Sequence, residues 1–286
     1  MEVLILKKII LFLLLTIMTL TNASVISAES YDFYVPVCIS VNGNYIKTDT
    51  KPYLEDGTTY VPVRAIADSL DSDSVTWNAD TKNVLIKKDD ITISIIIGKK
   101  TAFVNNKEVT VPGGAFIKND RTYVPLRFVS ESFGAKVGFN PDTYTVTILK
   151  DGVSVPSHCI LERAYSDEDI YWLSRIINAE SGGEPFIGKV AVGNVVINRV
   201  KSKDYPNTIT DVIFDTKYGV QFEPIINGSI YAIPSGESII AAKNALEGKN
   251  VVANSLFFLN ESIAENFWIV ENRTYLTKIG QHTFYL

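Results

Sequence analysis

The sequence predicts an α+β protein in which a strand-rich domain, built from a two-copy repeat, precedes a domain with helices first and a small sheet last. The repeat is visible in LEDGTTYVPVRAIADSL from Leu54, which aligns with IKNDRTYVPLRFVSESF from Ile117. Beyond residue 165, apolar residues recur every three or four positions, as in amphipathic helices, before strand-like runs close the chain. A chain of 286 residues is long enough for two such domains.

Residues 1–28 have the composition of a secretory signal peptide. Two lysines precede the apolar run IILFLLLTIMTL from Ile9, and the small residues Ala23 and Ala28 offer cleavage points. The run is shorter than the ~20 residues that span a bilayer. We therefore expect an exported protein with no stable membrane anchor after signal cleavage.

Each copy of the repeat predicts the same order of elements within residues 29–150. A turn signal, Asp56-Gly57 in the first copy and Asn119-Asp120 in the second, precedes a short β-type run, and a proline then opens a helix. Between the copies, ITISIIIG from Ile91 alternates isoleucine with other residues, which predicts a strand with one buried face. The domain is expected to contain more strand than helix, and no set of catalytic residues is visible in it.

Residues 151–165 are weakly patterned and are predicted to be a linker to a second domain, residues 166–286. Ser166, followed by three acidic residues, predicts the capped start of a helix. Gly182 and Gly183 are expected to end that helix, because glycine permits the left-handed geometry of a C-terminal cap.

Glu180 lies at the end of the apolar face of this helix. Ile177, Ile176 and Leu173 stand one and two turns earlier, so the carboxyl group is expected on the buried side. Desolvation disfavours the charged carboxylate and raises its pKa, which suits a general acid near neutral pH. The alternative is structural, with Glu180 as a solvated or hydrogen-bonded cap of the helix end.

The rest of the second domain is predicted to contain three more helices and a terminal sheet. The helices are expected from Pro185 to about Lys201, around residues 209–214, and from Ser235 to Gly248. The runs SLFFLN and FWIV and the hairpin-like YLTKIGQHTFYL are predicted to be strands.

The composition excludes several classes of function. The only histidines are His158 and His282, the only cysteines are Cys38 and Cys159, and none has partners at metal-ligand spacing. Neither a metal nor another cofactor is therefore expected, and two cysteines are too few for a disulfide scaffold. The formal net charge of −5 makes the protein acidic, so nucleic acid is not an expected partner.

The repeated TYVPxR helix start, followed in both copies by W/F-N-x-D-T, resembles the copper amine oxidase N-terminal-like domain, also called the stalk domain. The resemblance implies a module of secreted and surface proteins of Gram-positive bacteria that serves as a spacer or as a cell-wall attachment. It implies no copper site, because the oxidases carry their copper in a different domain.

Six ordered motifs of the second domain resemble the SleB/CwlJ cell wall hydrolases, the spore cortex-lytic enzymes. They are NAESGGEP, GKVAVGNVVINRVKSKDYPNTITDVIF, QFEPIINGSIY, AAKNALEG, FFLN and KIGQHTFY. The resemblance implies a lysozyme-related domain that cleaves peptidoglycan as a lytic transglycosylase, with Glu180 as the catalytic acid. The chain departs from the family where Gly182 replaces the usual Arg, where Asn260-Glu261 replaces NP, and where paired tryptophans are reduced to Trp268.

A lytic transglycosylase can manage with one carboxyl group, because the sugar's own 6-hydroxyl replaces water as the attacking group. Glu180 is then expected to protonate the oxygen between N-acetylmuramic acid and N-acetylglucosamine, and afterwards to accept the proton of the 6-hydroxyl. For plain hydrolysis, the candidate second carboxylates are Glu184, Asp211, Glu223 and Glu261.

Four residues inside the family-like motifs are candidates for binding the glycan strand: Gln221, Phe222, Tyr231 and Asn260. Each is equally compatible with core packing or turn formation. The expected function is that of an exported enzyme of the cell wall or spore cortex, acting on the cortex during germination. The alternative is a non-catalytic protein that binds the wall through its stalk repeat, and only the enzyme requires a carboxyl group at Glu180.

Overall fold

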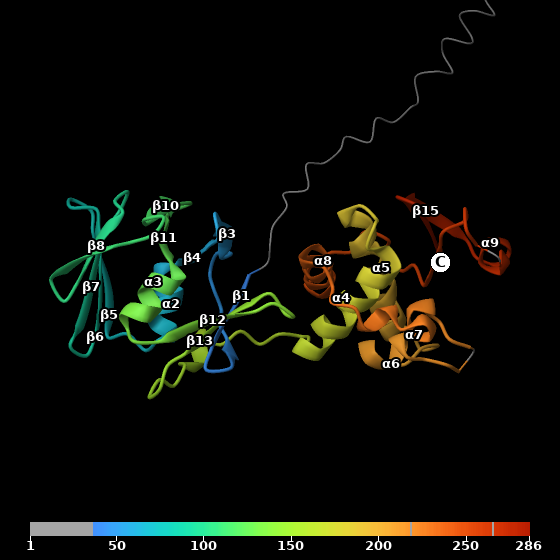
Figure 1. Cartoon of the computed structure of the whole chain (residues 1–286), viewed down its shortest axis with the longest axis horizontal. Coiled ribbons are helices and arrows are strands. Elements are labelled where there is room, and N and C mark those ends of the chain that lie inside the picture. The colour runs from blue at the N-terminus through green and yellow to red at the C-terminus, as the bar shows by residue number, and fades with distance from the viewer. Residues whose placement is uncertain (1–36, 218, 265) are drawn as a thin grey trace, which may run out of the picture. The chain divides into compact units, whose positions relative to one another are not determined.

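The computed structural model describes residues 37–217, 219–264 and 266–286 (Figure 1). Helices and strands are mixed along this part of the chain, as the α+β prediction requires. The predicted signal peptide, residues 1–28, lies outside the described residues. Within the described ranges, none of the helices combines the length and the apolar character needed to cross a membrane.

The N-terminal region, residues 37–165, is mainly strand. Its elements are β1 Cys38–Val41, β2 Asn44–Tyr45, β3 Tyr53–Glu55, β4 Thr58–Pro62, α2 Val63–Ser69, β5 Ser74–Asn78, β6 Asn83–Lys88, β7 Ile91–Ile96, β8 Thr101–Val104, β9 Lys107–Thr110, β10 Phe116–Lys118, β11 Arg121–Pro125, α3 Leu126–Ser132, β12 Lys136–Asn140, β13 Thr145–Leu149 and the 3-10 helix η1 Ser157–Cys159. The strands form sheets in the orders β12-β13-β1-β2, β10-β11-β4-β3 and β5-β6-β7-β8-β9. The pair β1 and β13 is parallel, and the other pairs are antiparallel.

The two expected proline-led helices are confirmed. Pro62 ends β4 and is the N-cap of α2, and Pro125 does the same for β11 and α3. Proline suits this position because its fixed φ leads into the helix and its missing N–H would have had no helical partner. The strands β4 and β11 pair with each other, with Val61 opposite Val124.

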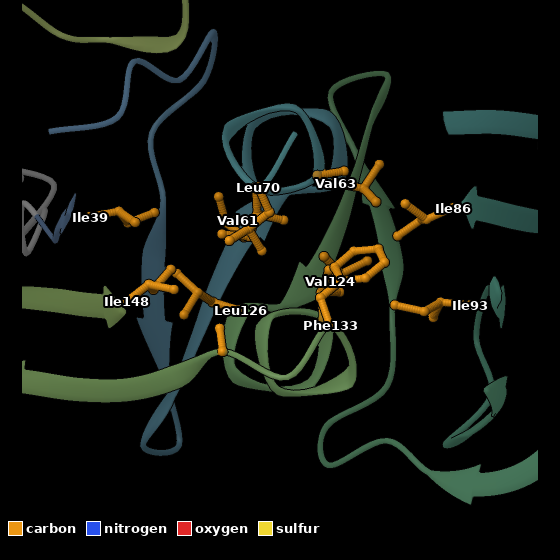
Figure 2. Packing of buried hydrophobic residues seen from close by; sticks show 14 of the residues in the cluster. Ile39, Val61, Val63, Leu70, Ile86, Ile93, Val124, Leu126, Phe133 and Ile148 are labelled. Atoms are coloured by element: carbon orange, nitrogen blue, oxygen red, sulfur yellow. The ribbon is translucent and has the colours of Figure 1, made fainter. Parts of the chain in front are cut away.

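The core of this region lies around the two short helices. Figure 2 shows Leu70 and Phe133, the C-caps of α2 and α3, among apolar side chains that several sheets contribute. The predicted strand β7 is confirmed and buries Ile93 and Ile95 completely, as its alternation requires. The region therefore has a contiguous apolar core of its own.

The segment predicted as a linker, residues 151–165, contributes to this core. Val155 and Cys159 are buried in it, and the Lys47 backbone N–H donates to the Cys159 carbonyl oxygen at 2.8 Å. A short irregular segment can bury two side chains without any helical or strand periodicity, so its pattern did not indicate this packing.

The C-terminal region, residues 166–286, begins with helices and ends with a small sheet. Its elements are α4 Asp167–Ser181, α5 Phe186–Lys201, α6 Ile209–Ile213, α7 Glu223–Asn227, the 3-10 helix η2 Ser229–Tyr231, α8 Gly236–Leu246, β14 Phe257–Leu259, α9 Trp268–Asn272, β15 Tyr275–Ile279 and β16 His282–Tyr285. The helices α4, α5 and α8 pack against one another, and α5 also contacts the sheet β14-β16-β15 (Figure 1).

Gly193 of α5 lies where these three helices meet. A Cβ atom at this position would be 2.9 Å from Ile177 Cδ1 of α4 and 3.2 Å from Ala245 Cβ of α8. The first distance is shorter than real Cβ contacts and the second is unusually tight, so the glycine allows the three helices to pack this closely.

The start of α4 follows the prediction and its end does not. Ser166 and Asp169 form a reciprocal capping box, because each side chain accepts a hydrogen bond from the other residue's backbone N–H. Gly182 has φ −55° and ψ −34°, and Gly183 does not have a positive φ either, so the expected left-handed cap is wrong. The glycine provides space instead, because a Cβ atom there would lie 2.6 Å from the Asn178 carbonyl oxygen.

The prediction of a strand at FWIV is also wrong, because Trp268–Asn272 is the helix α9. The Asn266 side chain accepts a hydrogen bond from the Trp268 backbone N–H at 2.8 Å, which satisfies a free donor at the helix start. This local capping overrides the strand preference of the aromatic and branched residues. The other two predicted strand regions are confirmed as β14 and the hairpin β15-β16.

Candidate active site

Glu180 lies in the last turn of α4 and lines a large cleft in the C-terminal region. The ends of α4 and α5, the segment that includes α7, and the residues around β14 and α9 form the walls of the cleft. Its volume is about 1560 Å³. Pockets for small molecules usually have about 300–1,000 Å³, so this cleft suits an extended ligand.

Burial and, to a smaller extent, the negative charge of Glu223 raise the pKa of Glu180, and the positive charge of Arg199 lowers it; together they bring it to about 7. A carboxyl group with this pKa is protonated in a large fraction of molecules at neutral pH. It can therefore donate a proton to a ligand in the cleft and accept one back, as a general acid and base must.

Arg199, in the last turn of α5, is a buried cation of this cleft and is not among the site residues predicted from the sequence. Its side chain is almost entirely buried, its Nε donates to the Leu256 carbonyl oxygen at 2.8 Å, and its guanidinium lies 5.1 Å from the ring centroids of both Tyr205 and Phe222. Its Nη1 has no hydrogen-bond partner among the described residues. Val196 and Val195, three and four residues before it, are buried, so Arg199 occupies a buried face of the helix. An arginine at such a position was the signal in the sequence that could have indicated a functional residue.

His282 is a second buried group in the wall of the cleft. Its ring lies 5.2 Å from that of Phe258 in an edge-on arrangement, and its Nδ1 has no hydrogen-bond partner among the described residues. Burial lowers the pKa of His282, so the imidazole is neutral at pH 7. It therefore adds no charge to the surroundings of Glu180 at that pH.

The structure brings three of the four candidate glycan-binding residues into the cleft. Gln221, Phe222 and Asn260 line it, whereas Tyr231 is exposed, lies outside the lining and packs edge-on against the ring of Trp172 at 6.2 Å. Phe222 is only 2% exposed and belongs to the hydrophobic core, so it supports the floor of the cleft.

The two amide side chains among these residues have partners in their own loops. Gln221 Nε2 donates to the Gly219 carbonyl oxygen at 3.0 Å. Asn260 Oδ1 accepts hydrogen bonds from the Ser262 backbone N–H at 3.1 Å and from its hydroxyl at 2.6 Å. Each amide keeps further hydrogen-bonding positions that a ligand can use.

The four other candidate carboxylates divide into two groups. Glu184 and Glu223 line the cleft with Glu180, and Glu184 Oε2 also accepts a hydrogen bond from the Gln281 backbone N–H at 2.9 Å. Asp211 and Glu261 lie outside the lining. Asp211 caps α6 with Thr208, and Glu261 accepts a hydrogen bond from the Tyr285 hydroxyl at 2.6 Å.

Three aromatic side chains, Phe257, Phe258 and Trp268, also line the cleft, and Trp268 is 49% exposed. Exposed aromatic faces stack on the apolar faces of sugar rings, and amide side chains bond their hydroxyl and acetamido groups. A carboxyl group with a raised pKa beside such surfaces defines a candidate glycan-cleaving site. The C-terminal region thus has the features of a glycan-processing enzyme.

Comparison with known proteins gives the family. The family model described as Cell Wall Hydrolase matches residues 183–285, and the one described as Copper amine oxidase N-terminal domain matches residues 40–148. A cell wall hydrolase CwlJ of Oceanobacillus iheyensis is 31% identical over 111 residues, which are 36% of this chain and 77% of that protein. The chain belongs to the cell wall hydrolase family, and both resemblances seen in the sequence are confirmed.

Two other relatives carry more specific names. A spore cortex-lytic enzyme of Bacillus cereus is 35% identical over 133 residues, which are 46% of this chain and 48% of that protein. The solved structure of the catalytic domain of the germination-specific lytic transglycosylase SleB from Bacillus anthracis is 35% identical, with a TM-score of 0.41, over 44% of this chain and 100% of that domain. The chain thus spans about half the length of the spore cortex-lytic enzyme.

Proposed function

We propose that this protein is an exported peptidoglycan-cleaving enzyme and that Glu180 is its catalytic acid. The observation that carries the proposal is the pKa of Glu180, which is raised to about 7, mainly by burial, in a cleft large enough for a glycan strand. The names of its relatives support the same activity and a spore cortex substrate during germination.

The proposed reaction is the cleavage of the bond between N-acetylmuramic acid and N-acetylglucosamine. Protonated Glu180 donates its proton to the bridging oxygen as the bond from that oxygen to the muramic acid C1 breaks. The resulting carboxylate then accepts the proton of the muramic acid 6-hydroxyl while that oxygen bonds to C1. The products are a 1,6-anhydromuramic acid end and a free N-acetylglucosamine hydroxyl, and Glu180 regains its proton.

The surroundings of Glu180 suit both halves of this reaction. Burial and the Glu223 charge favour the protonated form that the first step needs, and the Arg199 charge favours the carboxylate that forms afterwards. A pKa near 7 keeps both forms accessible at neutral pH. We further propose that the site is lysozyme-related and that Gln221 and Asn260 bind the glycan from the cleft wall.

For the N-terminal region we propose a spacer or cell-wall attachment that holds the enzyme near its polymeric substrate. The two-copy arrangement is part of this proposal, and its support is the match to the stalk-type family model and the equivalent proline-led helices α2 and α3. Residues 1–28 act as the export signal in this proposal.

The test is to replace Glu180 by Gln and to measure the release of anhydromuropeptides from spore cortex and from vegetative walls by mass spectrometry. Glu180→Gln keeps the side-chain size and removes the acid, so cleavage is expected to fall by about 10²-fold or more while the fold persists. Glu168→Gln, an exposed carboxylate at the far end of α4, is the matched control and should keep wild-type activity.

A Gln variant that cleaves near the wild-type rate would end the catalytic assignment. A folded wild-type protein that binds both substrates and cleaves neither would favour the non-catalytic wall-binding alternative. The products separate the two reaction types, because hydrolysis leaves a reducing end in place of the anhydro end.

A further inference from the structure

Arg273 lies over two aromatic rings in the lining of the cleft. Its guanidinium carbon lies 4.6 Å from the ring centroid of Phe257, in β14, and 4.9 Å from that of Trp268, in α9. All three residues line the same cleft as Glu180. The guanidinium is therefore positioned by cation–π contacts with two rings, which arginine forms more often than lysine.

No carboxylate of the described residues lies within 4.0 Å of this guanidinium, and none of its nitrogens makes a side-chain hydrogen bond to them. Other arginines of the chain do have such partners. Arg121 pairs with Asp49, and Arg127 with Glu131. The hydrogen-bonding edge of Arg273 thus remains open to a ligand in the cleft.

We propose that Arg273 binds a carboxylate of the substrate and so makes the enzyme selective for glycan strands that carry acidic stem peptides. A guanidinium binds a carboxylate through two parallel hydrogen bonds, and such charge-assisted pairs are stronger and more directional than neutral ones. The stem peptides attached to muramic acid carry free carboxylates, whereas the sugar rings themselves offer neutral hydroxyl and acetamido groups. This inference rests on the proposed function, because it takes the cleft to hold peptidoglycan.

The position of Arg273 suits a peptide that branches from a sugar chain in the cleft. Trp268 is 49% exposed even though the guanidinium packs on it, so the stack lies at an open edge of the cleft. A ligand that enters the cleft can then bring a branch to Arg273 while its sugar chain passes Glu180. Stacking also restricts the arginine side chain before the ligand binds, which lowers the entropy lost on binding.

The test compares two forms of one substrate. Soluble glycan strands bearing stem peptides are used directly, or after their free carboxylates have been converted to amides with a carbodiimide and ammonia. The wild-type enzyme is expected to show a KM about tenfold higher on the amidated strands, with kcat within about twofold, because one charge-assisted contact is lost. Arg273→Met should have this higher KM on both substrates and so lose the discrimination.

Two further variants separate recognition from general damage. Lys201→Met removes a positive charge from an exposed position outside the cleft lining and should keep the tenfold preference. Arg273→Lys keeps the charge but not the planar fork, so part of the preference should remain. The proposal is overturned if Arg273→Met still prefers the untreated strands, or if it lowers kcat equally on both substrates without changing either KM.

A binding assay separates this inference from the proposed function. Glu180→Gln protein, with and without Arg273→Met, is mixed with insoluble peptidoglycan before and after amidation, and the bound fraction is measured by sedimentation. Stronger binding to untreated material that disappears with Arg273→Met supports the inference even if the protein cleaves nothing. Equal binding to both materials by Glu180→Gln overturns it, whatever the activity of the wild type.

Discussion

The carboxyl groups of Glu180 and Glu223 share one cleft, and the negative charge of Glu223 adds to burial in raising the pKa of Glu180. The two residues are far apart in the sequence, at the end of α4 and at the start of α7. The charge of the exposed Glu223 thus affects the protonation of the half-buried Glu180.

Glu223→Gln should move the pH dependence of cleavage. A general acid must be protonated, so kcat/KM falls as the pH rises through its pKa. Removing the Glu223 charge lowers the pKa of Glu180, so the alkaline limb of the kcat/KM profile should shift to lower pH. Glu168→Gln should leave the limb unchanged, and an unshifted limb in Glu223→Gln would contradict the assignment of that limb to Glu180.

The stability of the protein should depend on pH through Glu180. Its pKa is raised from 4.5 to about 7 in the folded state, so the folded protein holds this proton more tightly than the unfolded chain. The stability that this group contributes is complete below pH 4.5 and is lost as the pH rises to about 7, by up to about 3 kcal/mol. Glu180→Gln does not titrate and should avoid that loss.

The measurement is urea unfolding of both proteins at pH 5 and pH 8. As the pH rises from 5 to 8, the free energy of unfolding of the Gln variant should increase relative to that of the wild type. Titrating groups that both proteins share cancel in this comparison. If Glu180 were instead a stabilising cap of the helix end, the variant would be less stable at both pH values.

Gly193→Ala should destabilise the C-terminal region. The added Cβ would lie 2.9 Å from Ile177 Cδ1, and overpacking of this kind typically costs about 1–3 kcal/mol. Gly183→Ala is the matched control, because a Cβ there meets nothing within 4 Å. Thermal unfolding of the two variants checks the prediction, and equal melting temperatures would show that α4, α5 and α8 tolerate a wider separation.

Cleavage should not depend on a metal ion. The proposed reaction needs only a carboxyl group and the sugar's own hydroxyl, and the described residues contain no cluster of three or more potential metal-ligating side chains. Treatment with EDTA should leave the rate of anhydromuropeptide release unchanged. A loss of activity that one particular ion restores would contradict this prediction.

The sequence by itself determined the local features. The capping residues Ser166 and Asp169, the prolines before α2 and α3, and the apolar stripe that leads to Glu180 are all read from neighbours within one or two helical turns. Such features depend on hydrogen bonds and periodicity over short distances along the chain, so they can be predicted without knowledge of the fold. The end of α4 and the helix α9 were misjudged because glycine and asparagine each have several local uses.

The tertiary structure alone decided which residues share the cleft. It placed Glu223 in the same cleft as Glu180 and left Asp211 and Glu261 as partners of Thr208 and Tyr285. It also brought the Arg199 and Arg273 guanidinium groups into the cleft walls, where aromatic rings from distant segments hold them. These contacts join residues far apart in the chain, and no spacing along the sequence records which distant segments pack together.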